Sequence, residues 1–339
     1  MQGRSIVVAA GLLAAIALPE WAAAQTGPEL LLKPFRDEDQ FEVTGSTLFG
    51  FETETSNNIS PGNPYDYRND IFNAQGRLRL TNGFSEEGIA RAQPRAGFSW
   101  SNVDLTTEDP NLPQDMSDVS VGFGMGILAV DGWLGGISFG VGYAAADTAS
   151  DANGTYLQGD FVVGKTFSNG VDTLGFVVDF NGNRSILPDV PLPGFQFRKQ
   201  LDDTKIFAVG FPFSGLEWTP TEELTIEIQY NIPDSFEARA DYEFFEDNES
   251  SGSLFASYRS HFYAAHWDEL DSGHDRVLFR QRFLEGGLLY RYSDRLLLTA
   301  AAGYVLDSDY EVGFDTRNTQ GLADIDPYPY LRAEFELRL

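Results

Sequence analysis

Apolar and polar residues alternate along most of this chain, and residues 330–339 show the pattern without interruption. Side chains two residues apart lie on the same face of a β-strand, so alternation gives a strand two different faces. One face here is apolar and the other is charged, with Leu331, Ala333, Phe335, Leu337 and Leu339 opposite Arg332, Glu334, Glu336 and Arg338. The segment is therefore predicted to be an amphipathic strand.

The same period of two recurs along the chain and predicts about fourteen strands, although a count of twelve also fits. The predicted strands cover 41–52, 71–80, 91–100, 119–129, 135–146, 155–166, 173–182, 204–214, 224–231, 236–243, 253–264, 277–292, 295–306 and 327–339. The alternation breaks phase around Glu285, Gly286 and Gly287, which predicts either a β-bulge or a misplaced strand boundary there.

The polar faces of these strands carry too many charges to pack as a dry core. They predict an all-β fold, a transmembrane antiparallel up-and-down β-barrel, with apolar faces toward lipid and polar faces toward a lumen. Connection lengths agree, because outer-membrane barrels have short periplasmic turns and long outer loops. Long connections are predicted at 53–70, 101–118, 147–154, 183–203, 265–276 and 307–326. The short turn at 232–235, which this register places outside, breaks the pattern.

The beginning of the chain predicts export. Arg4 precedes an apolar stretch from Ile6 to Leu18 that is too short to span a membrane, and Ala22-Ala23-Ala24 follows. We expect a signal peptide over 1–24, a short periplasmic segment over 25–38 and an outer-membrane barrel over 39–339, in a Gram-negative bacterium. The chain contains no cysteine, so neither disulfides nor a lipid-bearing cysteine is expected.

The formal net charge of −28 argues against binding nucleic acid. Arginine outnumbers lysine by nineteen to four, which favours charges held as planar, multiply bonded pairs in a confined polar space. A lineage bias toward arginine explains the ratio equally well. The inward faces predict lumen-lining residues that either border an aqueous path or cross-link into a plug. They are Arg77, Arg79, Arg91, Arg95, Glu227, Glu237, Arg239, Asp241, Arg259, Arg332, Glu334, Glu336 and Arg338, together with Glu42 and Glu243.

The last strand is also predicted to carry the signal read by the barrel assembly machinery. Its residues are Tyr330, Phe335, Leu337 and the terminal Leu339, where barrels commonly end in phenylalanine. Outer-membrane lipids and lipopolysaccharide are the other expected partners, and acidic residues in the long connections either attract cations or simply keep surface loops soluble.

A succession of short motifs follows residue 185. They are Ile186-Leu-Pro-Asp-Val190, Gly215-Leu-Glu-Trp-Thr-Pro220, Ile228 to Ser235, Phe283-Leu-Glu-Gly-Gly-Leu288 and Ala301-Ala-Gly-Tyr-Val-Leu306. Over roughly 185–339 the chain resembles a domain-of-unknown-function family of bacterial outer-membrane β-barrel proteins. The resemblance implies a location and a fold, and no chemistry.

Three histidines, His261, His266 and His274, lie near Ser260 and several aspartates. A Ser-His-Asp or metal site could be built there, but the chain has no Gly-x-Ser-x-Gly or His-Glu-x-x-His motif. Asp307-x-Asp309-x-Glu311 and Asp324-x-Asp326 lack the glycine spacing of a calcium loop. We therefore expect no catalytic residue, no metal and no cofactor.

These observations predict a passive, porin-like channel for small solutes. Two alternatives remain: a structural or adhesive barrel without transport, and an outer-membrane hydrolase acting on lipids at 261–274.

Overall fold

A computed structural model describes residues 31–32, 39–57, 64–81, 91–128, 132–147, 152–167, 172–231, 235–247, 249–267, 276–293 and 295–339. The strands are β1 (Phe41–Gly50), β2 (Thr53–Asn57), β3 (Tyr65–Arg79), β4 (Arg91–Thr107), β5 (Asp115–Leu128), β6 (Trp133–Ala146), β7 (Thr155–Thr166), β8 (Thr173–Asn181), β9 (Leu192–Asp202), β10 (Lys205–Phe211), β11 (Phe213–Trp218), β12 (Leu224–Asn231), β13 (Ser235–Glu246), β14 (Ser250–His266), β15 (Arg276–Tyr292), β16 (Leu296–Gly313), β17 (Thr319–Ile325) and β18 (Tyr328–Arg338). Within these ranges no helix is long and apolar enough to cross a membrane.

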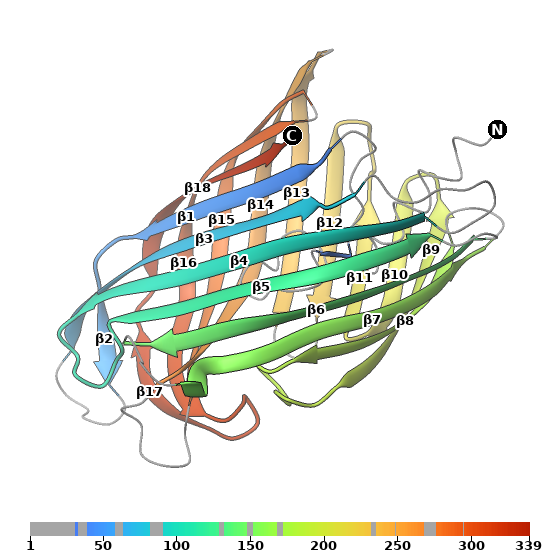
Figure 1. The fold of residues 1–339 in the computed structure, drawn as a ribbon. Coiled ribbons are helices and arrows are strands. Elements are labelled where there is room, and N and C mark those ends of the chain that lie inside the picture. Colours follow the sequence, from blue (N-terminus) through green and yellow to red (C-terminus); the bar gives the residue numbers. More distant parts are fainter. Residues whose placement is uncertain are drawn as a thin grey trace.

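The strands form one closed antiparallel barrel (Figure 1). β1 pairs with β3 on one side and with β18 on the other, which closes a ring of 16 strands. The short strands β2 and β17 continue β1 and β18 beyond a break and pair with each other. The first and last strands therefore lie side by side over their whole length.

The predicted fold class is confirmed, but the predicted strand count is wrong. The chain from 183 to 203 was expected to be a loop, and it contains β9 with Pro193 and Gly194, which obscure a strand pattern. The single strand expected over 204–214 is instead β10 and β11, separated at Pro212. These two additional strands raise the count from fourteen to sixteen.

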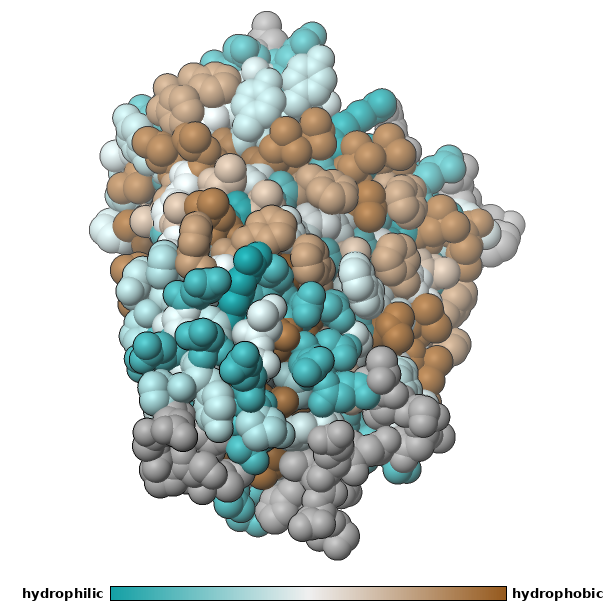
Figure 2. Space-filling model, turned by 90° about the vertical axis from the view of Figure 1, so that its left-hand side faces the viewer, coloured by the Kyte–Doolittle hydropathy of each residue, from teal (hydrophilic) through white to brown (hydrophobic). Residues whose placement is uncertain are grey.

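A band of apolar side chains covers the half of the barrel that holds the end of β18, on the face that Figure 2 shows. It is built from outward-facing residues such as Phe98, Ile137, Phe176, Leu288 and Phe335, all of them exposed. A closed barrel with an apolar outer band is the structure that spans an outer membrane, because only lipid makes such a surface favourable. We call this half the membrane tier.

The other half reverses this polarity, and we call it the distal tier. On β16 the outward residues change from Tyr304 and Leu306 to Asp307, Asp309 and Glu311. The same change occurs on β3, where Phe72 gives way to Asp70, Arg68 and Asp66. Figure 2 shows this hydrophilic surface below the apolar band. A charged exterior requires water, so the distal tier projects beyond the membrane.

Much of the distal tier was expected to be loop, and that expectation is wrong. β3, β4, β5 and β16 extend into the stretches predicted as connections at 53–70, 101–118 and 307–326, and β2 and β17 lie within them. The alternation does continue there, but with charges outside and apolar residues inside. The signature of a lipid-facing strand is therefore absent, although the strands are present.

The distal tier is a smaller closed barrel. Its nine strands pair in the order β14, β15, β16, β17, β2, β3, β4, β5 and β6. The ring closes where His266 of β14 pairs with Ala145 of β6, the one parallel contact between strands among the described residues. Barrels of about eight strands are just wide enough for side chains to fill their interior. We therefore expect a packed interior at this end.

The interior of the distal tier is a dry apolar core. Tyr67, Val103, Phe279, Val305 and Tyr310 are almost completely buried there. The rings of Phe279 and Tyr310 stack with their centroids 4.2 Å apart. This core blocks the axis of the barrel at the distal end.

The barrel wall has unequal height. β14, β15 and β16 contain 17, 17 and 18 residues, whereas β10, β11 and β12 contain 7, 6 and 8. The strands from β7 to β13 take no part in the distal ring, so they end at the level of the membrane tier. We call the stretch from β9 to β13 the low wall.

The break in phase predicted at Glu285 is also wrong. Phe283, Glu285 and Leu289 all face inward on an uninterrupted β15, and the irregularity lies on β16 between Val305 and Asp307. The residues only seem out of phase because the interior changes from apolar to charged at the boundary between the tiers.

Candidate functional site: a charged network on the inner wall

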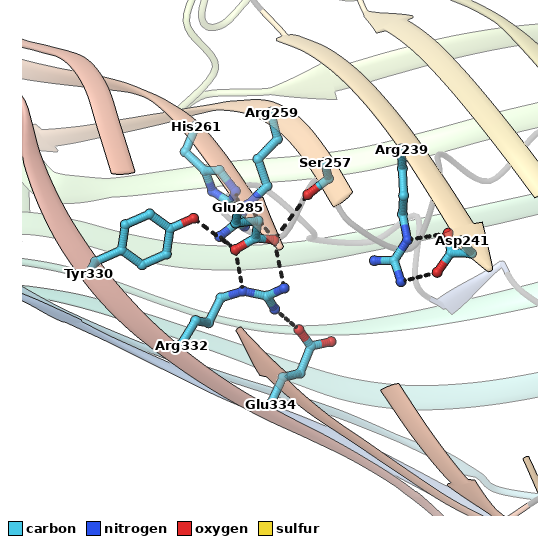
Figure 3. Close-up of polar contacts among 9 residues, drawn as sticks. All are labelled: Arg239, Asp241, Ser257, Arg259, His261, Glu285, Tyr330, Arg332 and Glu334. Atoms are coloured by element: carbon cyan, nitrogen blue, oxygen red, sulfur yellow. Dashed lines mark hydrogen bonds and ion pairs between the residues drawn. The ribbon is translucent and has the colours of Figure 1, made fainter. Parts of the chain in front are cut away.

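Glu285 is the centre of a buried charged network just inside the membrane tier (Figure 3). Arg332 donates two hydrogen bonds to its carboxylate, at 2.8 and 3.0 Å, and Tyr330 donates one at 2.8 Å. Ser257 donates at 3.2 Å and Arg259 at 3.4 Å. The side chain of Glu285 is only 1% exposed, so these donors replace the water that an ionised carboxylate would otherwise bind.

The strand register explains why these residues meet. Ser257 lies directly opposite Glu285 on β14, while Gly303 of β16 separates Glu285 from Tyr330 on β18. A Cβ atom at Gly303 would lie 2.8 Å from the Cβ of Glu285 and 2.8 Å from the ring of Tyr330. The missing side chain therefore allows groups two strands apart to bond across β16.

Arg259 connects this network to His261. Nη1 of Arg259 lies 2.6 Å from Nε2 of His261, and both side chains are buried. A guanidinium can only donate, so Nε2 accepts the bond and the imidazole is neutral with its proton on Nδ1. His261 also packs edge-on against Phe283. The lone pair on Nε2 of His261 accepts the hydrogen bond from Arg259. His261 is therefore poorly placed to accept a proton as a general base.

Other predicted lumen-lining residues form separate ion pairs. Arg77 donates to Glu42 at 2.6 Å, and Arg338 lies 3.8 Å from the same carboxylate while also pairing with Glu336. Such pairs lock side chains in place and leave little free charge for solvent.

On β13, Arg239 binds Asp241 through two hydrogen bonds of 2.6 Å, and its guanidinium lies over the ring of Phe255. On β18, Arg332 also pairs with Glu334. Arg79 is buried on the inner face of β3. The side chain of Arg91 lies outside the described residues.

The inner face of the low wall differs, because several of its carboxylate and amide side chains are partly exposed. Glu217 of β11 lies directly opposite Glu227 of β12, and Gln229 of β12 lies opposite Glu237 of β13. The side chain of Glu217 is 46% exposed and lies 3.9 Å from Arg198 of β9. Carboxylates directly opposite each other repel, so this stretch favours water or cations between them.

Glu285, Glu217 and Arg198 were missing from the predicted lumen residues. Glu285 was missed because the expected bulge removed it from the inward face, although continuing the alternation from Phe283 finds it. Arg198 lay in a predicted loop. Glu217 lay in a motif that was not assigned to a strand.

The predicted assembly signal divides between the two faces of β18. Phe335 and Leu339 are exposed on the outer surface, and Leu337 is partly exposed. Tyr330 is buried inside, bonded to Glu285. Its signalling role, like that of the other three residues, stays a prediction.

The histidine region is only partly described, since His274 lies outside the described residues. Ser260 and His261 are consecutive on β14 and therefore point to opposite faces. In the part of the chain that the structure describes, no three His, Asp or Glu side chains form a group suited to a metal ion.

The connection between β8 and β9 is tied to the distal tier. Arg276 of β15 donates to the backbone oxygens of Asn183 and Arg184, and Asn183 donates to the oxygen of Ala264. This connection crosses the place where β14 extends beyond β13, so it covers the exposed edge of β14.

Asp315, in the turn between β16 and β17, also contacts this connection. Its carboxylate accepts a bond of 3.2 Å from the backbone N–H of Leu187 and bonds of 2.5 and 2.8 Å from Arg317. Desolvation raises the pKa of Asp315, but the bonds from Arg317 and Leu187 outweigh it, and the pKa lies below its ordinary value.

No protein-family model matches the sequence, and no curated protein is similar to it. Three solved structures are similar to the chain at low identity over most of its length. The deltaS2 mutant of the TodX monoaromatic hydrocarbon channel has 10% identity and a TM-score of 0.41, with 92% of this chain and 94% of that chain covered. OccAB4 from Acinetobacter baumannii has 9% identity and a TM-score of 0.38, covering 90% and 100%. LpxR from Salmonella typhimurium has 9% identity and a TM-score of 0.31, covering 88% and 100%. Similarities this distant carry no information about the activity of this chain. The resemblance of residues 185–339 to a domain-of-unknown-function family stays a prediction.

Proposed function

We propose that this protein is a passive, porin-like channel for small solutes, and that the solute path follows the low wall. The observation that carries the proposal is the partial exposure of the inward polar side chains on β9 to β13. Barrels of sixteen strands are wide enough to hold an aqueous channel. Along this wall the inward side chains of Glu217, Glu227, Gln229 and Glu237 are all partly exposed.

The rest of the interior supports this course. The distal core blocks the barrel axis, and the predicted lining residues on β1, β3, β14 and β18 are held in buried ion pairs. The outer opening of the proposed solute path then lies beside the distal tier, at the distal ends of the short strands β10 to β12. Only Pro212 separates β10 from β11 on that rim, so a single residue forms the connection there.

Charge along the path predicts a preference for cations. Glu217, Glu227 and Glu237 project from three adjacent strands, and Arg239 is neutralised by Asp241. Carboxylates lining a narrow aqueous path raise the local concentration of cations.

Planar-bilayer recordings in a potassium chloride gradient test both parts of the proposal. The native protein should conduct, with a reversal potential that shows cation preference, and Glu217→Gln with Glu227→Gln should reduce that preference. Asp307→Asn is the matched control, because Asp307 is an exposed carboxylate on the outside of the distal tier. An absence of conductance would reject the channel, and an unchanged reversal potential would reject the path.

A second candidate is a structural or adhesive barrel without transport. The distal tier favours it, since a rigid, charged body beyond the membrane suits contact with other surface molecules. This candidate predicts no conductance in any variant. It also predicts that binding to lipopolysaccharide or to whole cells is weakened by changes at Arg280 and Arg282.

A lipid hydrolase is the least supported candidate, because His261 is bonded to Arg259 and points away from Ser260. Hydrolysis of a lipid substrate that disappears in His261→Ala or His266→Ala would establish the hydrolase instead.

For the partners, we propose that lipid contacts the apolar band and that the barrel assembly machinery binds β18. Slower membrane insertion of Phe335→Ser and Leu339→Ser would support the second point. The resemblance of 185–339 to a domain-of-unknown-function family of outer-membrane barrels is compatible with each candidate.

A further inference from the structure

Two leucines near the start of the chain lie inside the barrel. Leu31 and Leu32 are 3% and 2% exposed, and they form a short turn within the ring of strands (Figure 1). They precede β1, so they take no part in the barrel wall. Burial this complete for two apolar side chains in a polar lumen requires a matching surface.

That surface is a groove of four glycines on the inner faces of β4, β5 and β6: Gly97, Gly122, Gly124 and Gly136. A Cβ atom added at Gly97 would lie 2.8 Å from Leu31 Cδ2, and one at Gly136 would lie 2.9 Å from Leu32 Cδ2. At Gly124 it would lie 2.5 Å from Leu31 Cβ. Three neighbouring strands thus omit their side chains where the two leucines sit.

A buried arginine fixes the position of the backbone. Nη1 of Arg95, on β4 beside Gly97, donates a hydrogen bond of 2.7 Å to the carbonyl oxygen of Leu31. Arg95 is only 1% exposed, and it also donates to Gln93 at 2.8 Å. A charged donor aimed at a backbone carbonyl is a recognition contact that glycines alone cannot provide.

We propose that the glycine groove is a binding site for the segment containing Leu31 and Leu32, and that this segment is a displaceable stopper in the lumen. β5 and β13 lie on opposite sides of the sixteen-stranded ring. The stopper therefore occupies lumen space on the wall across from β13, and it reduces the cross-section that remains beside the proposed path. Its role as a stopper rests on the proposed channel function, whereas its binding in the groove does not.

Cysteine labelling tests the binding directly, since the native chain has no cysteine. Gly136→Cys places a thiol beneath Leu32 and displaces only the end of that flexible side chain. In the full-length protein this thiol should react slowly with a hydrophilic maleimide. Adding Leu31→Ser and Leu32→Ser should accelerate labelling about tenfold or more, because two buried apolar side chains no longer hold the segment.

Asp307→Cys on β16 is the control reporter, since it is exposed on the outer face of the distal tier and lies outside the lumen. Its labelling rate should be the same with and without the serine substitutions. Equal labelling of Gly136→Cys in both backgrounds would overturn the proposal.

Conductance tests the stopper role. The Leu31→Ser, Leu32→Ser protein should have a larger single-channel conductance than the native protein. If labelling depends on the leucines and neither protein conducts, the channel function fails and the groove assignment stands. If both conduct equally although labelling differs, the groove binds the segment and the stopper role is rejected.

Discussion

Glu285→Gln should destabilise the barrel strongly, because it removes the negative charge that pairs with both Arg259 and Arg332. The substitution keeps the volume and most hydrogen-bonding atoms of the side chain, so packing is nearly unchanged. What it removes is the charge that compensates two guanidinium groups with side chains 10% and 5% exposed. Removing one partner of a buried ion pair costs about 3–5 kcal/mol of unfolding free energy.

Urea unfolding of the refolded protein in detergent micelles measures this cost. Tryptophan fluorescence and the heat-modifiable mobility of the barrel on gels are two independent readouts. Asp307→Asn is the control, since its ion pair with Arg282 is about half exposed and such pairs contribute about 0–1 kcal/mol.

A double-mutant cycle shows whether the network is the cause. Glu285→Gln combined with Arg332→Gln should cost less than the sum of the two single changes, by about 0.5–3 kcal/mol. A loss below about 1 kcal/mol for Glu285→Gln, or strict additivity in the cycle, would refute the argument that Glu285 holds this wall together.

Three further predictions concern the distal tier, its tether and the network. Phe279→Ala should reduce the unfolding free energy by about 3–5 kcal/mol, measured by urea unfolding, because Phe279 is fully buried in the distal core. The hydrogen bond from the Leu187 amide to Asp315 should protect that amide from hydrogen exchange above a pH of about 4. This protection should be lost as the pH falls through the lowered pKa of Asp315. Asp315→Asn should abolish this pH dependence after correction for intrinsic exchange. Gly303→Ala should cost about 1–3 kcal/mol in the same unfolding assay, whereas Gly286→Ala, whose nearest contact would be 3.4 Å away, should cost much less.

The membrane tier could be predicted from sequence because a lipid-facing strand has a simple signature. Segments such as 41–50 and 328–338 alternate between apolar and charged residues, and the structure makes them strands. The burial of Arg77, Arg259 and Arg332 also agrees with their position on inward faces. A period of two fixes the face of every residue in a strand, provided that the register is right.

The distal tier could not be predicted in the same way, since its pattern reverses without any marker in the sequence. Asp307, Asp309 and Glu311 look like a soluble acidic loop, and they lie on the outer face of β16. Pairings such as β6 with β14 join residues more than a hundred positions apart, and no local pattern encodes them. The position of Leu31 and Leu32 is likewise hidden, because a short apolar stretch after a predicted export signal has no characteristic period.

The distal ring also constrains the order in which the protein can assemble. Two of its seams join distant parts of the chain: β2 to β17 and β6 to β14. Its apolar core includes residues from Leu48 to Tyr330, so it stays incomplete until nearly the whole chain is in place. Strands of 17 residues extend about 55 Å, whereas crossing lipid requires only about 9–11 residues. The distal ring therefore cannot be complete before β17 has joined β2, so its core is finished late, when the last strands join the first.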